Sequence, residues 1–203
     1  MQTNWNDCSR CVLFKKRVGQ VKGVYNEQGR ILLILSEPSN EMSARFLDKA
    51  IANASDNKMD SHDLAITEVV GCSFERTNQK NFPFKGMCSI PSVAITTCRE
   101  RALYLIDKVD PHIIIASGLP AAKIIGIKSG SLTQFNNREI KEVQVKGHLI
   151  KIPRMVMVIP TLSWLIKNFT RDPEGPTAHC VNIFRKAIEY SELRQETIGD
   201  RYE

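Results

Sequence analysis

The chain has 203 residues, 42% of them hydrophobic and 25% charged, with a net charge of +6. This length and composition are typical of a soluble globular protein with one domain, long enough to bury a sizeable core. No apolar run approaches the about 20 residues of a membrane span, and the N-terminus lacks the apolar region of a signal peptide, so a cytoplasmic location without membrane contact is expected.

The first half of the chain predicts two buried strands and one helix. Residues 1–28 are irregular and carry cysteines, and "GRILLILSEP" (29–38) is a short apolar run typical of a buried strand. Helical spacing follows in 40–54, with Met42, Phe46, Ala50 and Ile51 expected near one face. A second strand is predicted in 63–72, and 73–92 has the composition of a loop.

The second half predicts further strands that alternate with helices. A helix is expected over 94–109, and a β-branched run then meets Ser-Gly-Leu-Pro and continues into a helix within 112–126. Residues 138–153 alternate about Lys146-Gly147 and predict a hairpin. A buried strand in 155–160 and an amphipathic helix in 176–195 complete the pattern.

This alternation predicts an α/β fold with a mainly parallel central sheet. We expect a single domain over 1–195 and a polar, frayed tail over 196–203. Sheets of this kind bind ligands at the carboxyl ends of their strands. In this chain, the ends are predicted at residues 36–38, 68–72, 117–118 and 159–161.

The basic residues recur in small groups. One group, Lys15, Lys16 and Arg17, stands beside a cysteine pair near the N-terminus. Excess positive charge is typical of proteins that bind polyanions, most commonly nucleic acid, although a solvated basic surface gives the same composition.

The six cysteines are not expected to form structural disulfides in a reducing compartment. They are either buried small side chains or ligands of a metal or cluster. Cys8 and Cys11 form a Cys-x2-Cys pair, Cys72 ends the second predicted strand, and Cys98 lies in the first turns of the next helix. Four thiolates would hold a [4Fe–4S] cluster, and a zinc site has the same ligand count.

Several of these segments together resemble the iron–sulfur (family 4 and 5) uracil-DNA glycosylases. "CSRCVLFKKRV" is similar to the opening of that family, Cys-x2-Cys-x-Leu-x3-Arg. "ILLILSEPSNE" occupies the place of its first strand and Gly-Glu-Ala-Pro-Gly loop, and "AITEVVGC" resembles its Ile-Thr-Asn-Val-Val-Lys-Cys. "CRERALYLIDKVDPHIIIASGLPAA" resembles the cysteine, helix and strand that follow. The order and spacing of the segments, over about residues 8 to 190, carry the resemblance.

The resemblance implies a three-layer sandwich with a four-stranded, mainly parallel sheet and a small additional hairpin. It also implies a structural [4Fe–4S] cluster that holds loops facing DNA, with Cys8, Cys11, Cys72 and Cys98 as ligands. Cys88 competes with Cys98 for the fourth position, but Cys98 keeps the register of the following helix, and loops absorb insertions at little cost. Cys180 is expected in the core.

The chemistry of uracil excision depends on three strand-end positions in this family, and they diverge here. Glu37 matches the acidic residue of the first loop, although the glycines of that loop are missing. Glu68 replaces the asparagine that reads the base, and an ionised carboxylate only accepts hydrogen bonds. Ile159 replaces the histidine before proline, which removes a donor for the developing base anion.

Two functions are therefore compared. The first is a glycosylase-like iron–sulfur protein, weak or inactive in uracil excision, which acts as a monomer that binds DNA or a DNA-associated protein. Its expected DNA contacts are Lys15, Lys16, Arg17, Ser117, Gly118, Ser163 and Trp164. Trp164 would stack on a base or, equally, fill the core. The second is a DNA repair enzyme, a glycosylase of altered base specificity that uses Glu37 and Glu68. A zinc-bound partner-binding module is a third, weaker alternative.

Overall fold

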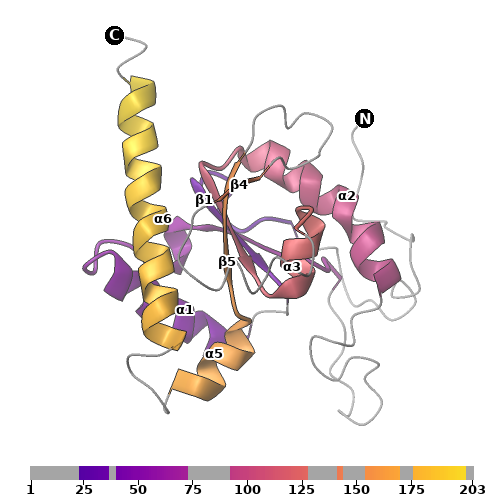
Figure 1. Cartoon of the computed structure of the whole chain (residues 1–203), viewed down its shortest axis with the longest axis horizontal. Coiled ribbons are helices and arrows are strands. Elements are labelled where there is room, and N and C mark those ends of the chain that lie inside the picture. Colours follow the sequence, from indigo (N-terminus) through magenta and orange to yellow (C-terminus); the bar gives the residue numbers. More distant parts are fainter. Residues whose placement is uncertain are drawn as a thin grey trace.

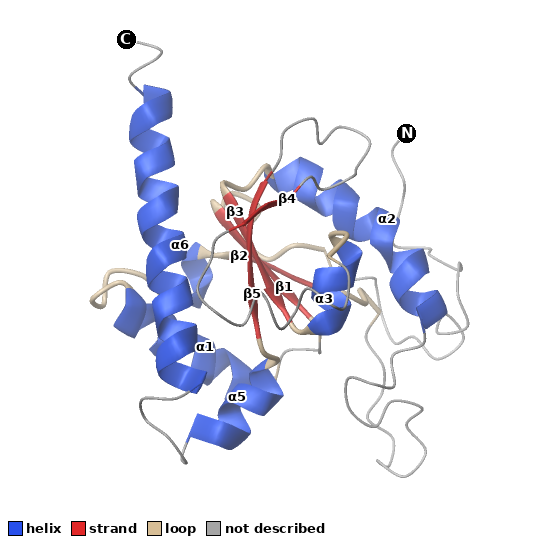
Figure 2. Ribbon diagram, viewed as in Figure 1, coloured by secondary structure: helices blue, strands red, loops and turns tan. Residues whose placement is uncertain are grey.

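The computed structural model describes residues 23–36, 40–72, 92–127, 141–143, 154–169 and 176–199. The strands are Ile31–Leu35 (β1), Ala65–Glu68 (β2), Ile113–Ser117 (β3), Lys141–Val143 (β4) and Arg154–Ile159 (β5). The helices are Glu41–Ala54 (α1), Ser92–Val109 (α2), Leu119–Ile124 (α3), Leu162–Phe169 (α5) and Pro176–Gly199 (α6), with a short 3-10 helix at Ser61–Asp63 (η3) (Figures 1 and 2).

One open sheet with the strand order β2-β1-β3-β5-β4 forms the centre of the fold. β2, β1, β3 and β5 run parallel, and β4 pairs antiparallel with β5 at the edge. The prediction of an α/β fold with four parallel strands is confirmed. Because the chain moves from β1 outward to β2 and then returns to the other side of β1 to form β3, the strand order reverses between β1 and β3.

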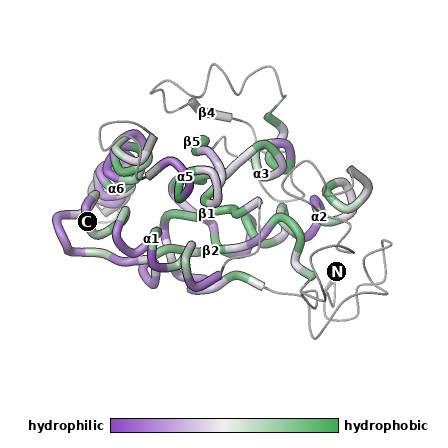
Figure 3. The backbone as a smooth tube through the Cα atoms, turned by 90° about the horizontal axis from the view of Figure 1, so that it is seen from below, coloured by the Kyte–Doolittle hydropathy of each residue, from purple (hydrophilic) through white to green (hydrophobic). Residues whose placement is uncertain are grey.

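Helices cover both faces of the sheet, which explains the unbroken apolar runs of β1 and β3. α1, α5 and α6 pack on one face over Leu33, Leu35 and Ile115. α2 and α3 pack on the other face over Leu32, Ile34 and Ile114. Figure 1 places these two groups of helices on opposite sides of the sheet, and Figure 3 shows hydrophobic residues gathered along the strands, while α1 and α6 also carry hydrophilic ones.

Two local features set the positions of the helices at the strand ends. α1 begins with a capping box: the Asn40 side chain accepts a hydrogen bond from the Ser43 amide at 2.9 Å, and the Ser43 hydroxyl accepts one from the Asn40 amide at 2.8 Å. Gly118 joins β3 to α3 with φ at 84°, a backbone conformation that favours glycine.

Two predictions differ from the structure, and a third is tested only in part. Lys141–Val143 of the expected hairpin pairs with β5 (Lys141 with Val156), and the rest of that hairpin, 138–140 and 144–153, lies outside the described residues. α6 continues to Gly199, so the expected tail 196–203 begins as helix. Met42 is 63% exposed because the buried side of α1 runs through Ser43, Leu47, Ala50, Ile51 and Ala54. None of the helices in the described ranges is long and apolar enough to cross a membrane.

Candidate functional site

The carboxyl ends of the four parallel strands form one row at a single edge of the sheet. Leu35 is in register with Glu68 on one side and with Ser117 on the other, and Ser117 is in register with Ile159. The reversal of strand order lies between Leu35 and Ser117, and this is where open α/β sheets bind ligands. The positions that sequence reasoning selected in β2, β3 and β5 therefore lie at one edge, and Glu37, just past β1, lies outside the described residues.

Hydrogen bonds within the fold tie the turn from β3 to α3 to its neighbours. The Ser36 hydroxyl donates to the Ser117 carbonyl and accepts from the Ala121 amide at 3.1 Å. The Gly118 amide donates to the Ile159 carbonyl at 2.8 Å, and the Ser117 hydroxyl donates to the Pro160 carbonyl at 3.2 Å. The structure thus brings Ser117 and Gly118 to the edge, with their donor groups engaged by the protein itself.

Ile159 is part of the core. Its side chain is 1% exposed and belongs to the same buried cluster as Leu162 and Leu165 of α5. An aliphatic side chain offers no hydrogen bond, and this one packs against other apolar residues of the cluster. The carboxyl end of β5 is therefore part of the hydrophobic core.

Glu68 is a buried carboxylate at the end of β2. The guanidinium of Arg101, in α2, donates to the backbone carbonyl of Glu68, and this contact ties the end of the strand to the helix. The carboxylate of Glu68 is therefore held inside the protein, in the row of strand ends.

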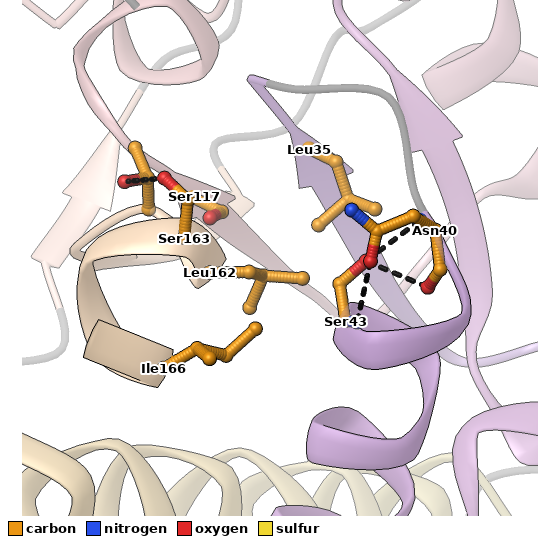
Figure 4. A pocket seen from close by; sticks show the side chains of 8 residues that line it. Leu35, Asn40, Ser43, Ser117, Leu162, Ser163 and Ile166 are labelled. Atoms are coloured by element: carbon orange, nitrogen blue, oxygen red, sulfur yellow. Dashed lines mark hydrogen bonds between the residues drawn. The ribbon is translucent and has the colours of Figure 1, made fainter. Parts of the chain in front are cut away.

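The hollow between β1 and β3 at this edge is small. It has a volume of about 30 Å³ and is lined by Leu35, Asn40, Ser43, Ser117, Thr161, Leu162, Ser163 and Ile166 (Figure 4). Such a space is of the order of a single water molecule in liquid water. The lining hydroxyls come from the starts of α1 and α5 and from the end of β3, and Leu35, Leu162 and Ile166 form the apolar part of the wall.

Two large apolar side chains are exposed at the starts of neighbouring helices beside this hollow. Trp164 in α5 is 45% exposed, so the alternative that it fills the core is wrong, and Met42 lies near the start of α1. The Trp164 amide donates to the Thr161 hydroxyl at 3.3 Å, and the Asn168 side chain donates to the Trp164 carbonyl at 2.7 Å. The sequence pattern assigned Met42 to the apolar face of the helix, although its position two residues after the capping Asn40 places it at the strand-end edge.

Cys72 and Cys98 are both buried on the β2 and α2 side of the molecule. Cys98 precedes Arg101 by three residues in α2, so the two side chains share a helix face. Arg101 contacts the Glu68 carbonyl, four residues before Cys72, and that helix face is therefore turned toward the chain leaving β2. Within the described ranges, no three His, Cys, Asp or Glu side chains gather as a metal site.

Of the remaining cysteines and cations that the sequence analysis selected, one lies in the core and the others lie outside the described residues. Cys180 is fully buried, as predicted, and burial raises the pKa of its thiol to about 12. The expected ligands Cys8 and Cys11, the competing Cys88, and the cations Lys15, Lys16 and Arg17 lie outside the described residues.

A larger hollow of about 350 Å³ lies beside α6, away from the row of strand ends. Met157 of β5 forms part of its floor, and His179, Asn182, Lys186 and Glu189 are on its helical wall. Met157 pairs with Ile115, two residues before the row at Ser117 and Ile159. This hollow is thus separate from the candidate site, and His179 belongs to it.

Comparison with known proteins adds no family assignment. No protein-family model matches the chain, and no curated protein sequence matches it.

Proposed function

We propose that this chain is a [4Fe–4S] DNA-binding protein with a uracil-DNA glycosylase-like scaffold, weak or inactive in uracil excision, which acts by holding DNA or a DNA-associated partner. The observation that carries the proposal is the filled end of β5. Ile159 is packed in the core where the resembling family has a histidine, and the adjoining hollow has a volume of about 30 Å³.

The loss of excision follows from the chemistry of the leaving base. A donor that stabilises a developing anion contributes about 2.7–4 kcal/mol to the transition state, and an isoleucine side chain contributes none. Glu68 at the end of β2 would present a carboxylate, which only accepts hydrogen bonds, to the carbonyl edge of uracil. These two positions together oppose recognition and departure of uracil.

The proposed DNA contact is the edge that carries Trp164, Ser163 and Met42. Exposed aromatic side chains provide stacking platforms for bases, and the net charge of +6 favours attraction to phosphates. Lys15, Lys16 and Arg17 would add phosphate contacts beside the cluster. Ser117 and Gly118 would support the shape of the edge, because their donors already bind protein carbonyls.

The proposed [4Fe–4S] cluster depends on four cysteine thiolates as its ligands. Cys72 and Cys98 are buried thiols on segments that face each other, which suits soft iron coordination, and Cys8 and Cys11 would complete four ligands. When bound, the cluster would brace the loops around it. Zinc held by the same four thiolates is the alternative cofactor.

Anaerobic purification and DNA titration test both parts of this proposal. The expected protein is brown, contains about four iron atoms per chain, and binds duplex DNA with an affinity that falls as salt rises. Colourless protein with one zinc per chain would exclude the cluster. DNA binding that is absent or insensitive to salt would exclude the nucleic-acid function.

Burial of Glu68 at the strand-end row favours a second candidate, a glycosylase that removes a base bearing an exocyclic amine, with Glu37 and Glu68 as its acid–base pair. Single-turnover assays on duplexes that contain uracil, hypoxanthine or modified pyrimidines distinguish the two. Base release that disappears in both Glu37→Gln and Glu68→Gln would replace the binding function with this one.

A further inference from the structure

Arg101 is a buried cation in the middle of α2. Its residue is 2% exposed, and its guanidinium donates to the backbone carbonyl of Glu68 at the end of β2. Burial of a guanidinium is costly unless hydrogen bonds compensate for the lost water. The hydrogen bond to the Glu68 carbonyl contributes to this compensation and holds the end of β2 against α2.

The two joined segments carry the two described candidate ligands. Cys98 precedes Arg101 by three residues on the same face of α2, and Cys72 follows Glu68 by four residues. Both thiols are buried. A hydrogen bond from Arg101 to the Glu68 carbonyl thus restrains the chain that leads to Cys72 against the helix face that presents Cys98.

Arg99 provides a comparison within the same helix. Its Nε donates to the carbonyl of Ile124, at the end of α3, at 3.0 Å. Both arginines thus donate to a backbone carbonyl, but Arg99 joins α2 to α3 and Arg101 joins α2 to the end of β2. Only the Arg101 contact involves the chain that carries Cys72.

We propose that Arg101 is a positioning residue that keeps Cys72 and Cys98 close enough for their thiolates to bind one soft metal centre. This deepens the proposed function, on which it rests for the identity of that centre. Residues that orient metal ligands from outside the coordination sphere typically change metal affinity by about 10-fold to 100-fold.

The first test asks, in the absence of iron, whether the thiols of Cys72 and Cys98 lie close enough together to be bridged by one arsenic atom. In the metal-free full chain with Cys8, Cys11 and Cys88 replaced by serine, phenylarsine oxide bridges two neighbouring thiols, and peptide mass spectrometry identifies the pair. We expect a Cys72–Cys98 bridge in the parent chain, an affinity about 10-fold lower in Arg101→Met, and partial recovery in Arg101→Lys, which keeps a donor. Arg99→Met is expected to retain the parent affinity.

The inference is wrong if the parent chain forms no such bridge, if Arg101→Met retains full affinity, or if Arg99→Met loses as much. Should Arg101→Met fail to fold, the smaller loss of affinity expected in Arg101→Lys is compared with Arg99→Lys, which should keep the parent affinity. The second test uses the protein as purified anaerobically and measures iron release to a chelator, which should be about 10-fold faster in Arg101→Met than in Arg99→Met. A bridge that depends on Arg101 in a chain that never binds iron would uphold the positioning role and refute the proposed cofactor.

Discussion

The imidazole Nδ1 of His112 lies 3.1 Å from the backbone carbonyl oxygen of Ser191 and 3.2 Å from its hydroxyl. This contact joins the residue before β3 to the second half of α6, and the Arg194 guanidinium adds a hydrogen bond to the His112 carbonyl at 3.2 Å. These contacts hold the second half of the long C-terminal helix near the amino ends of the strands (Figure 1).

The environment of His112 predicts a loss of stability in mild acid. Desolvation by burial lowers the pKa of His112, with the nearby Arg194 and Arg30 acting in the same direction, while the hydrogen bond with Ser191 and the charge of Asp110 oppose it. The unfolded chain therefore binds the proton more readily than the folded one, and stability rises with pH. The contribution is complete above about pH 6.5 and declines as the pH falls through the lowered value.

Thermal unfolding at about pH 7.5 and pH 5.5 measures this effect, since the two values bracket the ordinary histidine pKa. His112→Gln should show a smaller difference in melting temperature between the two pH values than the parent chain. His62→Gln, which removes an exposed histidine, is the matched control. An equal pH dependence in His112→Gln and the parent would contradict this role of His112.

The parallel strands could be predicted from the sequence because each buried strand appears there as a short, continuous run of apolar residues. β1 and β3 are short apolar runs covered on both faces, and the Gly118-Leu119-Pro120 turn marks the start of α3. The pairing of β4 with β5 was not predicted, because the choice of β5 as partner depends on long-range packing. For the same reason, the apolar pattern of α1 was assigned to a face that includes Met42, which the sheet does not cover.

The candidate site was less predictable than the fold. Residue identities and strand-end positions placed Glu68, Ser117 and Ile159 at one edge, as the register confirms. The size of the hollow and the hydrogen bond from the Gly118 amide to the Ile159 carbonyl depend on tertiary packing. The spacing of residues in the sequence does not predict such packing. Arg101 shows this limit most clearly: a charged residue in an amphipathic helix is expected in solvent, but this one is buried against a backbone carbonyl.

Gly29 is required by the close approach of two backbone segments. A Cβ placed on it would lie 2.2 Å from the Ala65 amide nitrogen, which belongs to β2 and cannot move without breaking the sheet. Gly29→Ala should therefore lower the free energy of unfolding by about 2 kcal/mol or more, as overpacking does in other cores. Urea denaturation measures the loss, and Gly23→Ala, with nothing within 4 Å of its Cβ, is the matched control. Equal stability of the two variants would refute the steric requirement.

Cys180 should be chemically inert in the folded protein. Burial raises its pKa to about 12, so the reactive thiolate is scarce near neutral pH, and the side chain is shielded within the α6 core. Brief alkylation with iodoacetamide, followed by peptide mass spectrometry, should leave Cys180 unmodified in buffer and modify it in denaturant. Rapid labelling in buffer would show that α6 opens readily from the sheet.

Trp164 gives the most direct test of the proposed DNA-binding edge. If its exposed indole stacks on a base, Trp164→Ala should weaken DNA binding by about 1–3 kcal/mol, the usual contribution of one stacked base, while the melting temperature changes little. Leu193→Ala removes a comparably exposed apolar side chain from the far half of α6, close to the Ser191 contact with His112 and thus at the opposite edge of the sheet. Fluorescence anisotropy with a labelled duplex at fixed salt compares the two variants with the parent chain. If Trp164→Ala binds as tightly as Leu193→Ala, the DNA contact lies on another surface.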